Sequence, residues 1–136
     1  DKGFRYLNPK NITLGKFVSL GHDNHFWAFQ SIKIGAYTQT AKDLLVIAGS
    51  HDKASLQPIG NQQVEIGAGC WIGARVTITG GVKIGKGVII GAGAVVVNDI
   101  PDFAIVGGVP AKVLSYRVPT ETQWNPFTAF TLSDLP

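Results

Sequence analysis

The sequence has few of the residues that many enzymes and secreted domains depend on. Its 136 residues include one cysteine, Cys70, and no methionine, and only 15% of them are charged. A single cysteine excludes an internal disulfide and every cysteine-rich zinc pattern, and it fits a reducing, cytoplasmic environment. Because soluble domains are usually about one-quarter charged, the low charge argues against a surface of amphipathic helices.

Long runs of one residue class are also missing. The 12 basic and 9 acidic residues give a net charge of +3 and are spread along the chain, so no nucleic-acid partner is predicted. The most apolar run covers residues 88–97 and is too short to cross a bilayer as a helix. No signal peptide is visible at the start. We therefore expect no membrane span.

The sequence is rich in glycine, with 17 residues, and it contains a six-residue repeat. From Val64 the chain reads VEIGAG, CWIGAR, VTITGG, VKIGKG, VIIGAG and AVVVND. The first and third positions of each unit are two residues apart, so they share one face of a strand. A glycine or small residue then permits a corner. Strands this short predict a coil in which each strand stacks on its equivalent one turn along.

The repeat is looser upstream, over residues 12–21 and 32–41. The stretch from His22 to Ser31 breaks the phase and predicts a short excursion from the coil. The polar stretch from His51 to Gln63 predicts a second loop. Pro101 ends the repeat, and residues 107–114 predict a turn and an edge strand. We expect an all-β coil domain over residues 1–118 and a non-repeat tail over 119–136 that packs on the coil or on a partner subunit.

The repeat, with Ile100-Pro101 and the stretch Gly108–Val113, resembles the hexapeptide-repeat acyltransferases. The strongest resemblance is to the sugar O-acetyltransferases, a group that includes the maltose and galactoside acetyltransferases, and it runs from about Ile12 to Arg117. It implies a left-handed parallel β-helix of triangular cross-section that works as a homotrimer, with active sites between neighbouring subunits. It also implies acetyl-CoA as co-substrate.

The resemblance places the general base at His51. The family uses one histidine on the strand and loop before the long repeat run, and His51 in the stretch Val46–Asp52 matches that place. His51 would take the proton from a substrate hydroxyl as its oxygen attacks the acetyl thioester. Histidine suits this role because a neutral imidazole is available near pH 7. The alternative is a solvated loop histidine without a catalytic role.

A polar cluster in the upstream loop supplies candidate substrate-binding residues. The candidates are His22, Asp23, Asn24 and His25. They would bind the acceptor sugar or orient His51, although the same composition is common in turns. Three histidines on this fold also suggest the zinc-binding carbonic-anhydrase branch, but the histidine spacing of that branch is absent. No metal is therefore predicted.

Further residues of this sequence match positions that line the acceptor and cofactor groove in the family. Trp71 points outward and would line the groove, with a trimer contact as the alternative. Ala74 and Ala92 lie one full coil apart, so they stack on one corner, where the family offers backbone groups to the pantetheine arm. Lys112 and Arg117 would contact the cofactor's phosphates.

Three positions complete the comparison with the family pattern. Asn98 stands where the family commonly has a lysine, and Ser115 where a second basic residue often appears. Both changes remove a positive charge from the expected cofactor site. Cys70 occupies an inward slot of the repeat and is expected to be part of the core rather than a nucleophile.

These observations predict an acetyl-CoA-dependent O-acetyltransferase that acts on a hydroxyl of a sugar or polysaccharide unit, as in polysaccharide biosynthesis. One alternative is N-acetylation of an amino sugar, which requires the same base. The other is a non-catalytic, trimeric binding protein.

Overall fold

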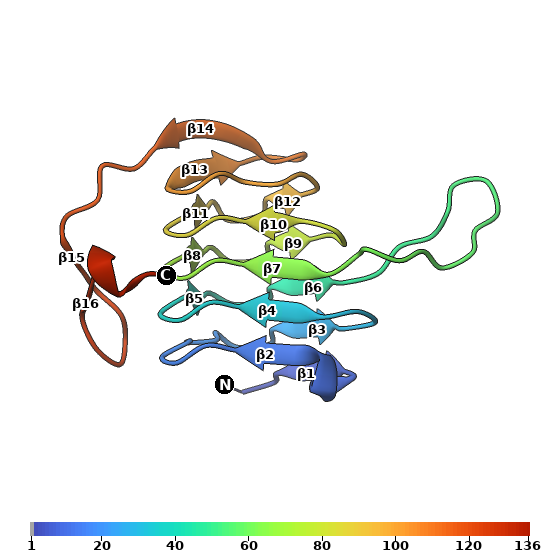
Figure 1. Ribbon diagram of the computed structural model, residues 1–136, viewed down its shortest axis with the longest axis horizontal. Helices are drawn as coiled ribbons and strands as arrows, with labels where there is room; N and C mark the ends of the chain where they lie inside the picture. Colours follow the sequence, from blue (N-terminus) through green and yellow to red (C-terminus); the bar gives the residue numbers. More distant parts are fainter. Residues whose placement is uncertain (1) are drawn as a thin grey trace.

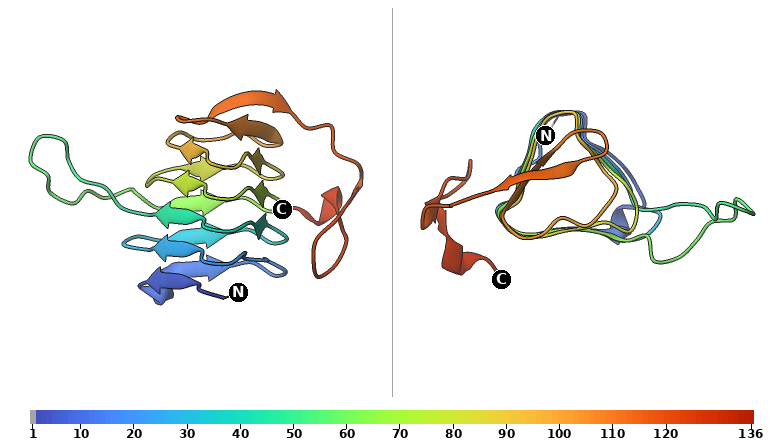
Figure 2. Two further views of the ribbon diagram at one scale, coloured as in Figure 1. Left: turned by 180° about the vertical axis from the view of Figure 1, so that it is seen from behind. Right: turned by 90° about the horizontal axis from the view of Figure 1, so that it is seen from above.

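A computed structural model describes residues 2–136 and shows a left-handed parallel β-helix. Three sheets, parallel except for the last strand β14, form the sides of a triangular prism (Figures 1 and 2). Sheet 1 consists of β1 (Arg5–Leu7), β3 (His25–Trp27), β6 (Leu45–Ile47), β9 (Thr77–Ile78) and β12 (Val95–Val96). Sheet 2 consists of β2 (Ile12–Leu14), β4 (Ile32–Ile34), β7 (Val64–Ile66) and β10 (Lys83–Ile84). Sheet 3 consists of β5 (Gln39–Thr40), β8 (Trp71–Ile72), β11 (Ile89–Ile90), β13 (Ala104–Gly107) and β14 (Lys112–Tyr116).

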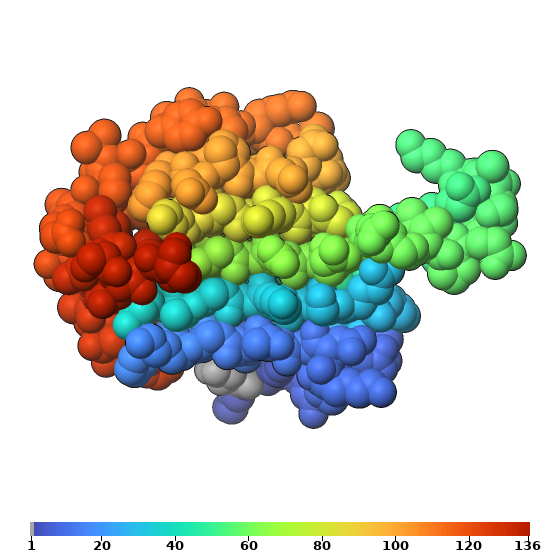
Figure 3. All heavy atoms as spheres, in the orientation of Figure 1, coloured from blue at the N-terminus to red at the C-terminus, as the bar shows by residue number. Residues whose placement is uncertain are grey.

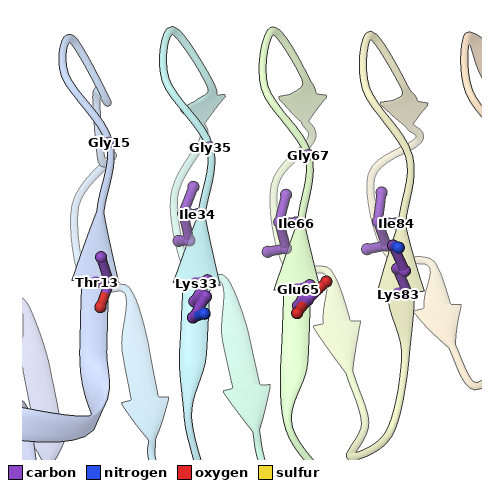
Figure 4. A pocket seen from close by; sticks show the side chains of 10 residues that line it. All are labelled: Thr13, Gly15, Lys33, Ile34, Gly35, Glu65, Ile66, Gly67, Lys83 and Ile84. Atoms are coloured by element: carbon purple, nitrogen blue, oxygen red, sulfur yellow. The ribbon is translucent and has the colours of Figure 1, made fainter. Parts of the chain in front are cut away.

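The alternation expected from the repeat is confirmed. The first and third residues of each unit from Val64 to Val96 are at most 3% exposed and fill the interior of the prism. Figure 4 shows the two faces of sheet 2, with Thr13, Lys33, Glu65 and Lys83 in a row on the outer side. The residues that follow Lys33, Glu65 and Lys83 on their strands, Ile34, Ile66 and Ile84, point to the other side and belong to the core. Burying a branched aliphatic side chain at every second position is what holds the coils together.

The excursion predicted between His22 and Ser31 is wrong. This stretch contains β3, which pairs in parallel with β1 and β6 and so forms one side of the coil. The phase breaks because the early coils are longer. Arg5 pairs with His25, which is 20 positions later, whereas Thr77 pairs with Val95, which is 18 positions later. The added residues lie at the corner between sheets 1 and 2, where Pro9–Asn11 forms a short 3-10 helix, η1.

The second predicted loop is present and leaves the coil at this same corner. It connects β6 to β7 and stands clear of the body of the molecule (Figures 1 and 3). We call residues 48–63 the arm. Because the arm replaces the short corner of the coils below it, the strands on either side of it keep their register, with His25 paired to Leu45 and Ile32 paired to Val64.

The C-terminal tail packs along the corner between sheets 2 and 3. Strand β14 runs antiparallel to β13, and the tail continues through the hairpin of β15 (Thr122–Gln123) and β16 (Phe130–Thr131) to the 3-10 helix η2 (Leu132–Asp134). The Phe130 ring stacks on Tyr37 at a centroid distance of 4.5 Å. Asn125 is buried and donates hydrogen bonds to the carbonyl oxygens of Phe17 and Tyr37. These contacts order the tail although it lies outside the repeat.

Both helices of the described chain are single 3-10 turns. No helix within residues 2–136 is long and apolar enough to cross a membrane.

The close stacking of corners predicts which repeat glycines tolerate a side chain. A Cβ on Gly67 would lie 2.5 Å from the backbone of Gly85 in the next coil, whereas a Cβ on Gly91 would meet nothing closer than 3.4 Å. We expect Gly67→Ala to lower the free energy of unfolding by about 1–3 kcal/mol or more. Gly91→Ala is the matched control, and we expect it to change stability by about 1 kcal/mol at most. Urea denaturation at one fixed protein concentration measures both, and equal effects would contradict the steric argument.

Candidate active site

His51 lies at the root of the arm, in a hairpin-like segment. His51 forms an antiparallel bridge with Pro58, and the amide of Ile59 donates a 3.1 Å hydrogen bond to the carbonyl of Ser50. The Nδ1 atom of His51 is 2.8 Å from the carbonyl oxygen of Leu56. Because a carbonyl oxygen only accepts hydrogen bonds, Nδ1 carries the proton in the neutral ring and Nε2 is left as an acceptor.

The turn at the tip of the arm is organised by Asp52. Its carboxylate accepts hydrogen bonds from the amides of Ala54 and Ser55, at 2.9 and 2.8 Å, and from the Ser55 hydroxyl. These bonds, with the Ser55 amide contributing most, lower the pKa of Asp52 from its usual value of 3.8. Asp52 is therefore ionised near neutral pH. Its carboxylate then keeps the hydrogen bonds from Ala54 and Ser55 that stabilise the turn leading to Leu56.

Gln30 holds the returning strand of the arm against the corner of the coil, a contact that we call the Gln30 clamp, and sequence reasoning did not identify it. Its side-chain amide donates to the carbonyl of Ile59 and accepts from the amide of Gln62, both at 2.8 Å. The backbone N–H of Gln30 donates a hydrogen bond to the carbonyl of Ala48, on the outgoing strand of the arm. Gln30 follows β3 at the corner where the coil carries added residues. The break in the repeat between His22 and Ser31 was the only feature of the sequence that pointed to this residue.

A cavity of about 480 Å³ opens between the arm and the outer face of sheet 1. The residues lining it are Trp27, Phe29, Gln30, Ile47, Gly49, Ser50, His51, Pro58 and Ile59. The size is that of a small-molecule binding site. Since the His51 ring forms part of the wall, a hydroxyl held in this cavity would lie beside a potential proton acceptor.

The structure separates the residues of the upstream polar cluster. His25 points outward from β3 and accepts a hydrogen bond on Nε2 from the indole N–H of Trp27, so it adjoins the cavity through that ring. His22 and Asp23 are exposed at the corner between sheets 3 and 1, and Asp23 lies 3.7 Å from the ammonium group of Lys42.

Asn24 is unsuited to the substrate contact predicted for it. It is 0% exposed, its amide nitrogen donates to the carbonyl of Ala41 at 2.9 Å, and its side-chain oxygen accepts from the hydroxyl of Thr40. A buried amide whose donor and acceptor are both satisfied inside the coil is unavailable to a ligand. Asn24 thus serves as a hydrogen-bonded part of the interior.

Ala74 and Ala92 stack on the corner between sheets 3 and 1, as their spacing predicts. The amide of Gly93 bonds to the carbonyl of Ala74 at 2.8 Å. The two alanines border a hollow of about 400 Å³ together with Lys42, Asp43, Arg75 and Gly93. The corner offers small side chains and accessible backbone, and its two cations are ion-paired, because Lys42 and Arg75 lie 3.5 and 3.6 Å from the carboxylate of Asp43.

Of the two basic residues predicted for cofactor phosphates, Lys112 is exposed at the start of β14. Arg117 is committed elsewhere. Its guanidinium donates to the carbonyl of Gly87 at 2.9 Å and to the side-chain oxygen of Gln123, which ties the tail to the coil. We therefore correct the role of Arg117 from phosphate contact to tail anchor.

Trp71 is half-exposed on the outer face of sheet 3, where it borders a small hollow together with Gln39 and Trp124 of the tail.

The arm leaves the corner between sheets 1 and 2, and the two alanines lie at the corner between sheets 3 and 1. One chain therefore does not bring His51 together with Ala74, Ala92 or Trp71. Figure 2, in the view down the coil, shows the arm leaving a single corner of the triangle.

Within residues 2–136, no three His, Cys, Asp or Glu side chains converge as a metal site would require. The described histidines lie on different parts of the coil, with His51 on the arm, His25 on β3 and His22 at another corner.

Burial makes Cys70 an inert thiol. Cys70 is 1% exposed, its Sγ contacts the carbonyl of Gly85 at 3.2 Å, and burial raises its pKa to about 11. We expect no reaction of the native protein with a thiol reagent at about pH 8, where an ordinary cysteine is partly ionised. One thiol should react after unfolding in guanidinium, and rapid labelling of the native protein would contradict the core placement.

The Gln30 clamp predicts how tightly the arm is held. Two hydrogen bonds of about 0.5–1.5 kcal/mol each are lost in Gln30→Ala, so we expect tryptic cleavage after Lys53 to accelerate roughly tenfold. Gln57→Ala, at the exposed tip of the arm, is the control and should leave the rate near that of the wild type. An unchanged cleavage rate in Gln30→Ala would show that other contacts hold the arm.

Comparison with known proteins agrees with this architecture. The bacterial transferase hexapeptide model, a family of six repeats, matches residues 63–98. A probable acetyltransferase of Mycobacterium tuberculosis is 34% identical over 123 residues, which is 86% of this chain but 41% of the relative.

Solved structures show the same likeness. A maltose O-acetyltransferase from Clostridium difficile has a TM-score of 0.80 and 32% identity, covering 85% of this chain and 64% of its own. A galactoside acetyltransferase in complex with coenzyme A has a TM-score of 0.77 and 25% identity, covering 83% of this chain and 58% of its own. The chain thus spans less than two-thirds of the length of each relative. By its repeat, its coil and these similarities, the chain has the hexapeptide-repeat β-helix fold and resembles these acetyltransferases over the part of their length that it spans.

Proposed function

We propose that this protein is an acetyl-CoA-dependent O-acetyltransferase that acts on a hydroxyl of a sugar or polysaccharide unit, with His51 as general base. The observation that carries the proposal is the His51 ring in the wall of a ligand-sized cavity, with Nδ1 held by the Leu56 carbonyl and Nε2 left to accept a proton. The names of the maltose and galactoside relatives support the sugar acceptor.

In this proposal the co-substrate supplies an activated acetyl group as a thioester. His51 accepts the proton of the acceptor hydroxyl as the new C–O bond forms and the C–S bond breaks. The same nitrogen then returns the proton to the sulfur of the departing thiol, so His51 ends the cycle neutral. The Leu56 carbonyl keeps the ring oriented, and it favours the positively charged ring during the transfer because it accepts the Nδ1 proton in a hydrogen bond.

Residues at the corner between sheets 3 and 1 fit the co-substrate. Ala74 and Ala92 leave room for a pantetheine arm against the backbone, and Lys42 and Arg75 border the same hollow. Lys112, exposed on β14, would contact phosphate. Asn98 and Ser115 do not replace the charges that the family pattern has there.

A complete site requires a second copy of the chain. His51 and the alanine corner lie at different corners of the prism, so an acetyl group bound at the alanine corner would meet His51 of a neighbouring subunit. This supports a homotrimer with sites between subunits, in which His22 and Asp23 lie on the co-substrate side and Trp71 lines the groove or contacts the neighbour.

A non-catalytic, trimeric binding protein is the second candidate. The observation that favours it is the commitment of Arg117 to the tail, together with Asn98 and Ser115 in place of basic residues. N-acetylation of an amino sugar would use the same base, because a protonated amine must also lose a proton before it attacks.

Calorimetry with acetyl-CoA and an assay of thiol release over a panel of sugars and amino sugars test the proposal. We expect His51→Gln to bind acetyl-CoA as the wild type does and to lose roughly 10²–10⁴-fold in turnover. Lys53→Ala, on the exposed arm, is the control and should retain both. No acetyl-CoA binding by the wild type would favour the binding protein, and turnover retained in His51→Gln would remove His51 as the base.

A further inference from the structure

The cavity beside His51 is mainly apolar. Five of its lining side chains are hydrocarbon or aromatic: Trp27, Phe29, Ile47, Pro58 and Ile59. Trp27 and Phe29 lie edge to face with their ring centroids 6.0 Å apart and are both about half-exposed. Trp27 lies on β3, Ile47 on β6, Phe29 at the corner after β3, and Pro58 and Ile59 on the arm, so the apolar wall lies where the root of the arm meets sheet 1.

Most polar atoms around the cavity are already used inside the protein. The Trp27 N–H is donated to His25, and the Gln30 amide is bonded on both sides by Ile59 and Gln62. Nδ1 of His51 faces the Leu56 carbonyl. Among the described side chains that line the cavity, Nε2 of His51, the hydroxyl of Ser50 and the second N–H of the Gln30 amide are left without a partner in this chain.

A free sugar is a poor match for such a cavity. Each hydroxyl that leaves water without a new hydrogen-bond partner weakens binding, and a free sugar carries a hydroxyl on most of its carbons. An aromatic or alkyl group gains by leaving water against Trp27, Phe29 and Ile59 and needs no partner. These few polar groups suffice for the one hydroxyl that reacts.

We propose that the cavity binds an apolar part of the acceptor, so that the hydroxyl acetylated is carried by, or is adjacent to, an aromatic or alkyl group. The inference rests on the proposed function for the role of His51 and narrows its substrate class. A plain polyhydroxylated sugar is then a weak acceptor, and a sugar that carries an apolar group is a better one. The cavity volume of about 480 Å³ accommodates a fused-ring group.

The concave part of the cavity suits a small molecule, while the neighbouring subunit of the proposed trimer would bring its co-substrate corner to the open side of His51. The space is concave, its wall includes the His51 ring, and the arm root that closes it is fixed by the Gln30 clamp. A protein partner would have to insert a side chain beside the base.

The test uses the full chain and two probe alcohols. 2-(2-Naphthyl)ethanol carries one hydroxyl on an apolar ring system, and methyl β-D-glucopyranoside carries several hydroxyls on a polar ring. We expect the naphthyl alcohol to bind at least tenfold more tightly by calorimetry or ligand-observed NMR. Phe29→Ser and Ile59→Asn should each weaken it at least fivefold, and both should fold, because these side chains are about half-exposed at the surface.

Leu14→Asn is the matched control. Leu14 is 43% exposed, against 37% for Ile59, but it lies at the end of β2 and not in the cavity. This variant should bind the naphthyl alcohol as the wild type does. His51→Gln should also retain binding, because the apolar wall is unchanged, while losing acetyl transfer to the probe.

The outcomes separate the inference from the proposed function. Binding that depends on Phe29 and Ile59 supports the apolar subsite even where no acetyl group is transferred, a result that would contradict the proposed function alone. Acetyl transfer to plain sugars with a KM unchanged in Phe29→Ser and Ile59→Asn would overturn the subsite and leave the function standing. If the wild type does not bind the naphthyl alcohol and Phe29→Ser and Ile59→Asn lose the oligomer, the apolar subsite is overturned. The apolar wall would then be a contact between subunits.

Discussion

The structure depends on direct stacking of backbone on backbone at the corners of the coil. Gly67 shows how close this approach is, because any side-chain atom there would lie 2.5 Å from the next coil. The amides on both sides of such a corner bond to carbonyls of the neighbouring coil, as Gly67 does to Ile84 and Gly85 to Ile100. A repeated corner without side chains therefore keeps the strands in register, and the aliphatic interior follows from that register.

This constraint confines variation to the few places where the coil is interrupted. The arm leaves at the corner that already carries added residues, and the tail packs outside another corner. His51, Gln30, Trp27 and Phe29 meet at the first of these places, and Arg117 and Phe130 at the second. A regular coil supplies a rigid frame, and the residues that differ from the repeat supply the chemistry.

The polar groups around the arm are mainly engaged in holding the arm itself. Asp52 organises its tip, Gln30 closes its root and the Leu56 carbonyl orients His51. A catalytic base needs this kind of support, because a ring that is free to rotate would rarely face its substrate. The same engagement leaves an apolar wall beside the proposed base, His51. The orientation of His51 and the apolar character of the cavity thus have one structural origin.

The sequence by itself determined the coil, the inward and outward faces of its strands, the core position of Cys70 and the stacking of Ala74 on Ala92. These properties follow from a spacing of six that each unit repeats, so local pattern alone specifies them. The tertiary structure decided the rest. The stretch His22–Ser31 contains a strand rather than an excursion because its added residues are absorbed at a corner, and Asn24 is buried because its amide bonds to Thr40 and Ala41 inside the coil. Gln30 meets Gln62, and Arg117 meets Gly87, only after the chain has closed whole coils, and no local spacing encodes contacts between such distant residues.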